Sequence, residues 1–459
     1  MMYDGAIINA TIVTMDKHHR VIPSAGLMWK DGRIVMVGSC KEVKNAALNN
    51  AIPITYADGA FVFPGLINTH NHLFQHLLKG LGVDMNLERW WPSVIGPAGS
   101  VLREKHLRAA VLSSSLEALR TGTTTILDYF HVHPVKGLSE VELDAISEAG
   151  IRLVYARGFR DGGNSKTFSH KGLEENLDDV FLEVLELKKR FNKNNNLARI
   201  YLAPASPPAI SLEGLTNVAS FSKKENIPVT MHVFETGSDD EVCLVRDGIT
   251  AIEYLDKAGI LSPFFLAVHC VKVNKNIISQ FVKHDVKISH NPLSNMYLAS
   301  GVAPVPDFLK AGLTVSLATD GAASNNSNNM LEVMKTTALL HKVMTGNPQT
   351  LTAQMVLEMA TIGGAKALGL STELGSLEEG KLADLFIFEP NKSATCSPIT
   401  DPVSALVYSA DSRGITTTVV GGRTLLKEDH FCHLNEAEVL HQEQIQAFDL
   451  ASKIGCHSK

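Results

Sequence analysis

The sequence predicts an α/β fold, a (β/α)8 barrel joined to a small β-sandwich domain built from both ends of the chain. Eight short apolar or β-branched segments alternate with helical segments between residues 61 and 373, which is the pattern of a parallel barrel. Residues 1–60 and 374–434 lack this alternation and are rich in short strands and turns. An open doubly wound sheet is the alternative, but no G-x-G-x-x-G follows the first strand of the alternating region.

The two β-rich ends are predicted to pair. Asp31-Gly32 separates two strand-like segments and is a strong hairpin signal, and Gly421-Gly422 is the corresponding signal near the other end. Because neither 1–60 nor 374–434 is large enough to be stable alone, we expect them to form one domain. Residues 435–459 are polar, and we expect a peripheral helix there.

The barrel is predicted for residues 61–373. Its expected strands cover residues 61–72, 123–127, 152–156, 200–203, 228–233, 264–268, 286–289 and 313–317. Its expected helices cover residues 102–120, 139–149, 173–192, 212–225, 249–258, 275–283, 306–311, 328–345 and 352–369. Ser139 and Glu142 have the spacing of a capping box, and Gly150 is a stop signal for the same helix.

Composition and charge narrow the class of protein. Hydrophobic residues make up 45% of the 459 residues and charged residues 20%, as in ordinary globular proteins. The net charge of -6 gives no electrostatic reason to expect a nucleic-acid partner. No apolar run reaches the roughly 18 residues of a membrane span, and the N-terminus has no secretory pattern. The six cysteines form no C-x-x-C pair, so we expect reduced thiols in a cytoplasmic protein.

Histidines and an aspartate recur where the predicted strands end. Residues two apart on a strand point to the same side, so His70 and His72 can present two imidazoles together. Later strands end in His232, His269, His290 and Asp320. Active sites of barrels lie at the C-terminal ends of the strands. Five of the eight strands therefore bring a metal-binding or proton-transferring group to one end of the barrel.

These residue types predict one divalent metal ion per subunit. Three imidazoles with one carboxylate suit Zn²⁺, and Fe²⁺ or Mn²⁺ also fit. The expected ligands are His70, His72, His232 and Asp320. They leave room for a water, which such an ion activates near neutral pH. The expected catalytic groups are Asp320, which aims the water, Glu235, which shuttles a proton, and His269, which orients the water or an oxyanion.

Two further histidine positions are ambiguous in the sequence. A second H-x-H, formed by His131 and His133, follows the second strand, and Pro134 ends that segment. We expect it in a loop or at the rim of the pocket rather than in the metal site. His290 either joins the site or forms a hydrogen bond within the mouth of the barrel.

The strand-end motifs resemble those of the amidohydrolase superfamily. The resemblance rests on PGLINTHNH, HVFE, AVHC, SHNPLSNMYLASGVAPVP, ATDGAASNNSNNM and LGSLEEGKLADL, and it extends over about residues 5 to 430. The most similar branch holds the methylthioadenosine/S-adenosylhomocysteine deaminases, the guanine-type deaminases and the triazine hydrolases. The resemblance implies a mononuclear metal site in a barrel, a homodimer, and the same ligands and catalytic residues. Gln75 and Arg157 match residues of that branch, and we expect both to contact the substrate, with a structural ion pair as the alternative role of Arg157. Trp90 is either a stacking platform for the substrate or a core residue.

Two departures from that branch bear on the substrate. Nucleoside-processing members carry a glutamate after the first barrel loop, whereas residues 91–99 contain no acid here. They also carry a histidine after the proline of strand four, whereas Pro204 is followed by Ala205 and Ser206. These departures favour a free base, a pterin or a triazine-like ring as the small-molecule substrate.

The sequence thus predicts an aminohydrolase that removes an exocyclic amino group from an aromatic N-heterocycle. A nucleoside deaminase of the methylthioadenosine, S-adenosylhomocysteine or adenosine type, and a hydrolase of chloro- or alkylamino-triazines, are the alternatives on the same site. Binuclear amide hydrolases of the superfamily often carry a lysine at the end of strand four, which here ends at Ala203 without one. A non-catalytic metal-binding protein is the rival from another class, although every expected catalytic position is filled.

Overall fold

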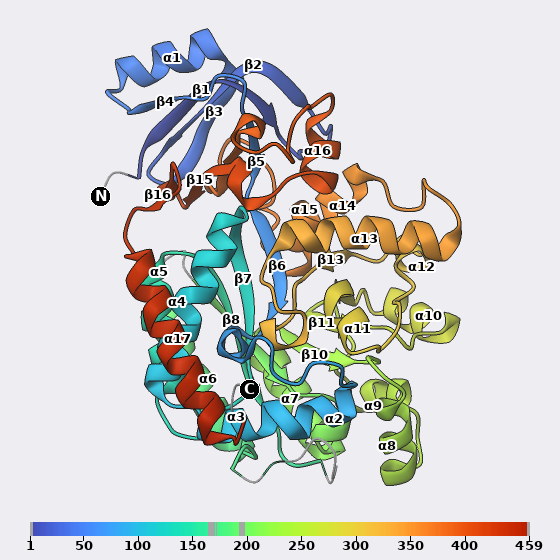
Figure 1. The fold of residues 1–459 in the computed structure, drawn as a ribbon. Coiled ribbons are helices and arrows are strands. Elements are labelled where there is room, and N and C mark those ends of the chain that lie inside the picture. Colours follow the sequence, from blue (N-terminus) through green and yellow to red (C-terminus); the bar gives the residue numbers. More distant parts are fainter. Residues whose placement is uncertain (1–2, 164–169, 171, 192–197, 457–459) are drawn as a thin grey trace.

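The computed structural model describes residues 3–163, 170, 172–191 and 198–456. Two β-sheets organise these residues (Figure 1). Eight parallel strands form the barrel, and nine strands from both ends of the chain form a second, mixed sheet beside it. The predicted fold, a barrel with a β domain made by both chain ends, is confirmed, with the β domain built as one nine-stranded sheet.

The barrel strands follow one another in chain order. They are β6 (Leu66–Asn71), β7 (Thr123–Phe130), β8 (Arg152–Phe159), β9 (Ala198–Pro204), β10 (Val229–Val233), β11 (Phe265–His269), β12 (Lys287–His290) and β13 (Val315–Leu317). Asp320 N donates to His70 O at 3.1 Å, and Thr69 Oγ1 donates to Leu317 O at 3.0 Å. The first and last strands therefore also meet, and the barrel is nearly closed.

The second sheet joins the two ends of the chain through β5. Its strands are β1 (Gly5–Val13), β2 (Val21–Lys30), β3 (Arg33–Ser39), β4 (Ile54–Tyr56), β5 (Phe61–Pro64), β14 (Leu385–Phe388), β15 (Ile415–Val420), β16 (Arg423–Lys427) and β17 (His430–Phe431). β5 pairs with β1 on one side and β14 on the other. The strand predicted for residues 61–72 is thus divided between two sheets. The break falls at Gly65, where an added Cβ would lie 2.0 Å from Thr124 Oγ1, so only glycine lets the chain pass.

Helices cover the outside of the barrel (Figure 1). The predicted ones appear as α4 (Glu104–Arg120), α5 (Leu138–Ala149), α6 (Leu177–Phe191), α7 (Leu212–Glu225), α9 (Ala251–Ala258), α10 (Lys275–Lys283), α12 (Val305–Lys310), α13 (Met330–Thr345), α14 (Ala353–Ala360) and α15 (Ile362–Ala367). The capping box predicted for α5 is wrong. The helix starts after Gly137, so Ser139 is not its N-cap residue. Ser139 Oγ donates to Glu183 and Glu142 is fully buried, so both side chains make tertiary contacts instead of capping the helix.

Several short elements have no clear signal in the sequence. They are α1 (Cys40–Asn49), η1 (Leu73–Leu78), α2 (Leu87–Trp90), η2 (Trp91–Ile95), α3 (Gly96–Val101), η3 (Pro207–Ala209), α8 (Ser238–Asp247), α11 (Pro292–Tyr297), η4 (Ala322–Ser324), η5 (Pro390–Lys392), α16 (Pro402–Tyr408) and η6 (Ser412–Gly414). Most of them have fewer than eight residues, too few to show a helical period. The exceptions are α1 and α8, with ten residues each, and α1 carries a true capping box formed by Ser39 and Glu42.

The chain ends in the long helix α17 (Glu436–Lys453), which runs down the side of the barrel (Figure 1). It packs on α4 and η1, with Val439 and Leu450 buried. Within the described ranges, no helix combines the length and the apolarity that crossing a bilayer would need.

A polar layer lies inside the barrel beneath the strand ends. Thr69 Oγ1 is 2.8 Å from the hydroxyls of both Ser289 and Ser316, and Asn68 Nδ2 donates to Thr319 Oγ1 at 2.7 Å. All of these residues are at most 1% exposed. Because buried polar groups are costly to leave unpaired, this network fixes the strand ends that carry the site.

Candidate active site

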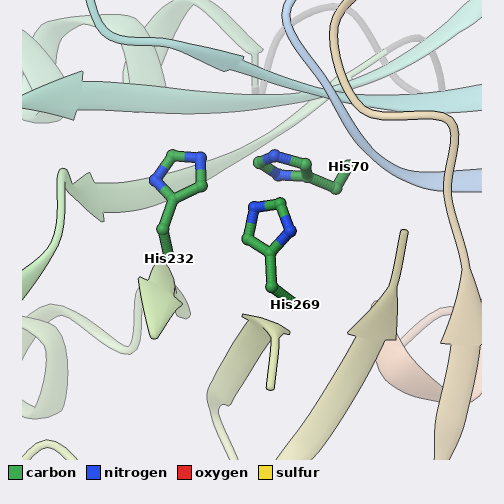
Figure 2. A group of neighbouring side chains, drawn as sticks. All are labelled: His70, His232 and His269. Carbon is green, nitrogen blue, oxygen red and sulfur yellow. The ribbon is translucent and has the colours of Figure 1, made fainter. Parts of the chain in front are cut away.

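Five titratable side chains converge at the C-terminal ends of the barrel strands. Ligand-type atoms of His70, His232 and His269 lie within 4.8 Å of one another, and so do those of His70, His72 and Asp320. Figure 2 shows the first three rings pointing toward one point above the strands. These five predicted strand-end residues are therefore brought together, and His70 belongs to both groups.

Short distances connect the members of this cluster. His72 Nε2 lies 3.2 Å from His232 Nε2 and 3.5 Å from Asp320 Oδ1. His70 Nε2 lies 3.4 Å from the same oxygen. These nitrogen and oxygen atoms carry lone pairs that would repel one another at such distances. Because they face a common centre, a divalent cation bound there would stabilise the arrangement.

Backbone carbonyls orient two of the imidazoles. His72 Nδ1 is 2.6 Å from Tyr129 O, and His232 Nδ1 is 2.7 Å from Ala205 O. A carbonyl only accepts, so each Nδ1 carries the proton and each Nε2 presents its lone pair to the centre. Bonds of this kind set the tautomer of metal-binding histidines.

The unpartnered atoms of His70 test whether a metal fits. Within the described part of the chain neither ring nitrogen of His70 has a hydrogen-bond partner, although the residue is 0% exposed. A buried polar atom without a partner costs about 1–3 kcal/mol. A ligand bond to a metal removes that cost, so this donor set fits a divalent ion.

The backbone is strained where the strands end. His269 has φ 72°, Asp320 has φ 63° and Phe234 has φ 56°. Left-handed conformations of such residues cost about 1–3 kcal/mol each and persist only when their surroundings impose them. The turns after β10, β11 and β13 are imposed by bonds such as Cys270 N to Val233 O at 3.1 Å.

Glu235 lies at the edge of the cluster and faces His269. Its Oε2 is 3.4 Å from His269 Nε2, and its Oε1 accepts from Ser300 Oγ at 3.1 Å. His269 Nδ1 is 2.9 Å from Asn295 Oδ1, and its Nε2 is 3.9 Å from Asp320 Oδ2. His269 therefore stands between the two carboxylates.

Burial shifts the protonation of these groups. It lowers the pKa of His70 and His232 and lowers that of His72 to about 3, so all three are neutral at pH 7, as metal ligands must be. Burial alone would raise the pKa of the Asp320 carboxyl, but His70, together with His269 and His72, outweighs burial and holds that pKa well below its usual range. Burial raises the pKa of Glu235 against the opposing charge of His269, which suits a group that exchanges protons.

A cleft opens from this cluster to solvent. Most of the exposed surface of the cleft is apolar, although half of the wall residues away from the cluster are polar or charged. The wall residues are Gln75, Leu87, Trp90, Trp91, Ile95, His131, Arg160, Ala205, Ser206, Ala209, Thr236, Ser238, Asp239 and Leu298. Apolar clefts with a few placed polar groups are the usual form of small-molecule sites.

Comparison with known proteins identifies the family. Residues 61–425 match the model of the amidohydrolase family. The chain belongs to the amidohydrolase family. It is 35% identical to a 5'-deoxyadenosine deaminase of Methanosarcina acetivorans, over 98% of this chain and 99% of that protein. It is also 33% identical to a 5-methylthioadenosine/S-adenosylhomocysteine deaminase of Syntrophobacter fumaroxidans, over 95% of this chain and 96% of that protein.

Solved structures agree with this assignment. An atrazine chlorohydrolase from Arthrobacter aurescens, in complex with zinc and atraton, matches with a TM-score of 0.90 and 25% identity over 96% of this chain and 99% of that one. An adenosine deaminase from Xanthomonas campestris with bound zinc shares the fold, with a TM-score of 0.88 and 24% identity over 98% and 99% of the two chains. This amidohydrolase is a metal-dependent hydrolase of carbon–nitrogen bonds and lies among the deaminases of its family.

The predicted substrate residues of this amidohydrolase occupy different places. Gln75 and Trp90 line the cleft, and Gln75 Oε1 and Trp90 Nε1 are buried without a hydrogen-bond partner in the described residues. Arg157 lies outside the lining, and its guanidinium is bonded to Glu175 and Glu183.

Arg160 lines the cleft, and the sequence analysis missed it. It is 2% exposed, and its guanidinium lies 4.6 Å from the centre of the Trp91 ring. The alternation of β8 contains the signal. Val154 and Ala156 belong to the apolar cluster inside the barrel, so Arg157, one residue on, points to the helices. Arg160 lies beyond the strand end, where side chains reach the cleft.

Of the histidines that were ambiguous in the sequence, one lines the cleft and two lie outside its lining. His131 lines the cleft, with its ring centre 4.7 Å from that of His72, and it continues the inward face of Leu127 and Tyr129. His133 Nε2 is 3.1 Å from Phe130 O, outside the cleft lining. His290 Nε2 is 3.3 Å from His341 Nε2, also outside that lining.

Proposed function

We propose that this amidohydrolase is a zinc-dependent aminohydrolase that replaces an exocyclic amino group of an aromatic N-heterocycle by oxygen. One observation carries the proposal. Three neutral imidazoles and the Asp320 carboxylate face one centre, and Glu235, with its raised pKa, borders the same centre beside His269. Hydrolytic deamination needs a bound water, a base for it, and an acid for the ring and the leaving amine.

The ion would be held by His70, His72, His232 and Asp320. Zinc is supported by the donor set and by the zinc in two structural neighbours. When bound, it lowers the pKa of water so that hydroxide is available near neutral pH. His269 offers a further nitrogen at the same centre, and we assign it to orienting the water and the developing oxyanion.

Two carboxylates, Asp320 and Glu235, then exchange protons with the water and the substrate. Asp320 accepts a proton from the attacking water and aims it at the ring carbon. Glu235 gives its proton to the adjacent ring nitrogen, so that the tetrahedral carbon carries both oxygen and nitrogen. Glu235, now deprotonated, takes the proton of the new hydroxyl and passes it to the amine, so that the carbon–nitrogen bond breaks and ammonia and the ring carbonyl remain. The proton held by Asp320 then restores the proton that Glu235 gave to the ring nitrogen.

The cleft supports a flat ring as substrate. Trp90 and Trp91 line it beside Ile95, and aromatic walls of this kind stack on heterocycles. We propose an aminopurine, aminopterin or aminotriazine as the substrate, with Gln75, Trp90 and Arg160 as contacts and with Arg157 in a supporting position behind them. The absence of an acid in residues 91–99 supports a free ring.

A 5'-modified adenosine is the second candidate. The relatives named 5'-deoxyadenosine deaminase and 5-methylthioadenosine/S-adenosylhomocysteine deaminase, at 35% and 33% identity over nearly the whole chain, favour it. Both candidates carry the same amino group on the same kind of ring, so the chemistry at the cluster is shared and only the fit of the ribose differs.

Ammonia release tests the proposal. Zinc-loaded protein is incubated with free aminopurines, aminopterins, aminotriazines, adenosine and 5'-deoxyadenosine, and Glu235→Gln is the matched variant because it keeps the size of the side chain. We expect ammonia from at least one ring and a rate about 10²–10⁴ lower in the variant, with zinc retained. No ammonia from any member, or equal rates in the two proteins, contradicts the deaminase proposal.

We further propose that the protein acts as a cytoplasmic homodimer, which the family resemblance supports. The mass of the purified protein by light scattering tests the dimer.

A further inference from the structure

The C-terminal helix α17 reaches η1, the segment after His72, through partly buried polar contacts. α17 packs on α4 (Figure 1). It also packs on η1, which follows His72 directly. Its Asp449 Oδ2 lies 2.6 Å from His106 Nε2 of α4. One turn and a half earlier, Glu443 Oε1 lies 3.2 Å from Nε2 of His76, which is 4% exposed and belongs to η1.

A chain of hydrogen bonds continues from His76 to the cluster. Asn328 Nδ2 lies 3.0 Å from His76 Nδ1, and Asn71 Nδ2 donates to Asn328 Oδ1 at 2.8 Å. Asn71 stands between the predicted ligands His70 and His72. Its Nδ2 also donates to Thr319 Oγ1 at 2.8 Å, beside Asp320. Asn328 and Asn71 are at most 1% exposed, so water does not substitute for these bonds.

In this series of hydrogen bonds, the donor and acceptor of each bond determine the donor and acceptor of the next. Because Asn328 Nδ2 donates to it, Nδ1 of His76 is the acceptor, and the ring proton sits on Nε2, where Glu443 accepts it. The other tautomer would require the Asn328 amide to turn. Asn328 would then present a donor to the Asn71 donor, and its bond to Ser114 Oγ, now at 2.6 Å, would also reverse.

A second carboxylate does not take the place of Glu443. Glu117 Oε2 lies 3.7 Å from His76 Nδ1, on the other side of the ring. That carboxylate also accepts from Lys79 Nζ at 2.7 Å and from Asn328 N at 3.0 Å. Glu443 is thus the carboxylate that selects the Nε2 tautomer.

We propose that Glu443 of the C-terminal helix is a positioning residue for the metal ligands, acting through His76, Asn328 and Asn71. The inference rests on the proposed function of the site. It assigns α17 a part in catalysis, although the sequence predicts only a peripheral helix there. Partners of this kind, one step behind the ligands, typically change metal affinity or activity by about 10–100-fold.

Three variants test the proposal in the full-length protein. Glu443→Ala removes the acceptor, and Glu443→Gln restores an acceptor of the same reach without the charge. Glu438→Ala removes an exposed carboxylate of the same helix that bonds only to Gln442 in the described contacts. Zinc affinity is measured by competition with a chelator, kcat and KM by ammonia release, and folding by thermal unfolding.

We expect Glu443→Ala to lower zinc affinity and kcat by about tenfold with KM nearly unchanged. Glu443→Gln should recover most of both, and Glu438→Ala should match the unmodified protein. Unchanged zinc affinity and kcat in Glu443→Ala overturn the proposal, as does an equal loss in Glu438→Ala. If no protein releases ammonia, the proposed function fails, whereas zinc affinity still decides the role of Glu443.

Discussion

The metal cluster and the wall of the cleft differ in how the chain builds them. Every cluster residue lies at the end of a barrel strand or in the turn after it, held by the strand ladder. The wall comes from the short elements η1, α2, η2, η3 and α8 and from connecting residues such as Arg160 and Leu298. The cluster is therefore a property of the barrel, and the wall is a property of the segments inserted between its strands.

The chemistry of the two regions differs accordingly. The cluster is polar and buried, with His70 lacking hydrogen-bond partners in the described residues. The wall combines apolar side chains such as Trp90 and Ile95 with polar ones such as Gln75 and Arg160. Changes in the cluster should stop the reaction with any substrate, whereas changes in the wall should alter the choice and the affinity of substrate.

The largest effect is expected in the cluster. Asp320→Asn keeps the shape of the side chain but removes the charge that His70 and His72 face at 3.4 and 3.5 Å. We expect kcat to fall by about 10²–10⁴ with every substrate, because both the base and a ligand are lost. Steady-state ammonia release and bound zinc per chain are the measurements.

Asp307→Asn is the control, because Asp307 is exposed on α12. A loss confined to one substrate in Asp320→Asn would place Asp320 in the wall rather than in the cluster.

Two arginines three residues apart sharpen the comparison. Arg160→Gln should raise KM by about 10–100-fold, the value of a hydrogen bond from a charged group, with a smaller loss of stability than in Arg157→Gln. Arg157→Gln should instead lower the free energy of unfolding by about 3–5 kcal/mol, because it leaves Glu175 and Glu183 without their cation. The measurements are KM and denaturant unfolding of both variants. A raised KM in a fully stable Arg157→Gln protein would reverse the two roles.

Much of the fold and of the cluster could be predicted because parallel strands and their ends can be recognised in the sequence by apolar runs and by the alternation of side chains. The two-residue alternation places His70 and His72 together, and the apolar runs before His232, His269 and Asp320 mark the ends of parallel strands. The same alternation, extended past the strand, would have separated Arg157 from Arg160 and placed His131 in the cleft.

The rest is set by tertiary contacts without a local pattern. Residues 87–101 contain two prolines and two glycines and form three short helical elements without an apolar period. Glu443 is one of several acids on a polar helix, and only the packing of α17 brings it to His76. Ser139 and Glu142 show the opposite error, because a correct local pattern was overridden by burial.

Glu142 of α5 is buried together with Asp128 of β7, between the barrel and one of the helices that cover it. Its carboxyl and that of Asp128 are both 0% exposed, and Asp128 Oδ1 accepts from Leu73 N at 2.6 Å, just after His72. Burial raises the pKa of Asp128 to about 7 and raises that of Glu142 well above its usual value. The folded chain therefore binds these protons more tightly than the unfolded chain does.

The smallest predicted effect follows from this pair. Because the folded state holds more protons between about pH 4 and pH 7, stability contributed by the pair is full at low pH and falls as the pH rises. Glu142→Gln keeps a neutral donor to Asp128 and removes one titrating group. We expect it to raise stability at pH 8 by an amount on the order of 1–3 kcal/mol, with little change at pH 5. Denaturant unfolding at the two pH values is the measurement, with Glu140→Gln, exposed on the same helix, as the control. Equal gains at both pH values would show that the two carboxyls do not share a proton.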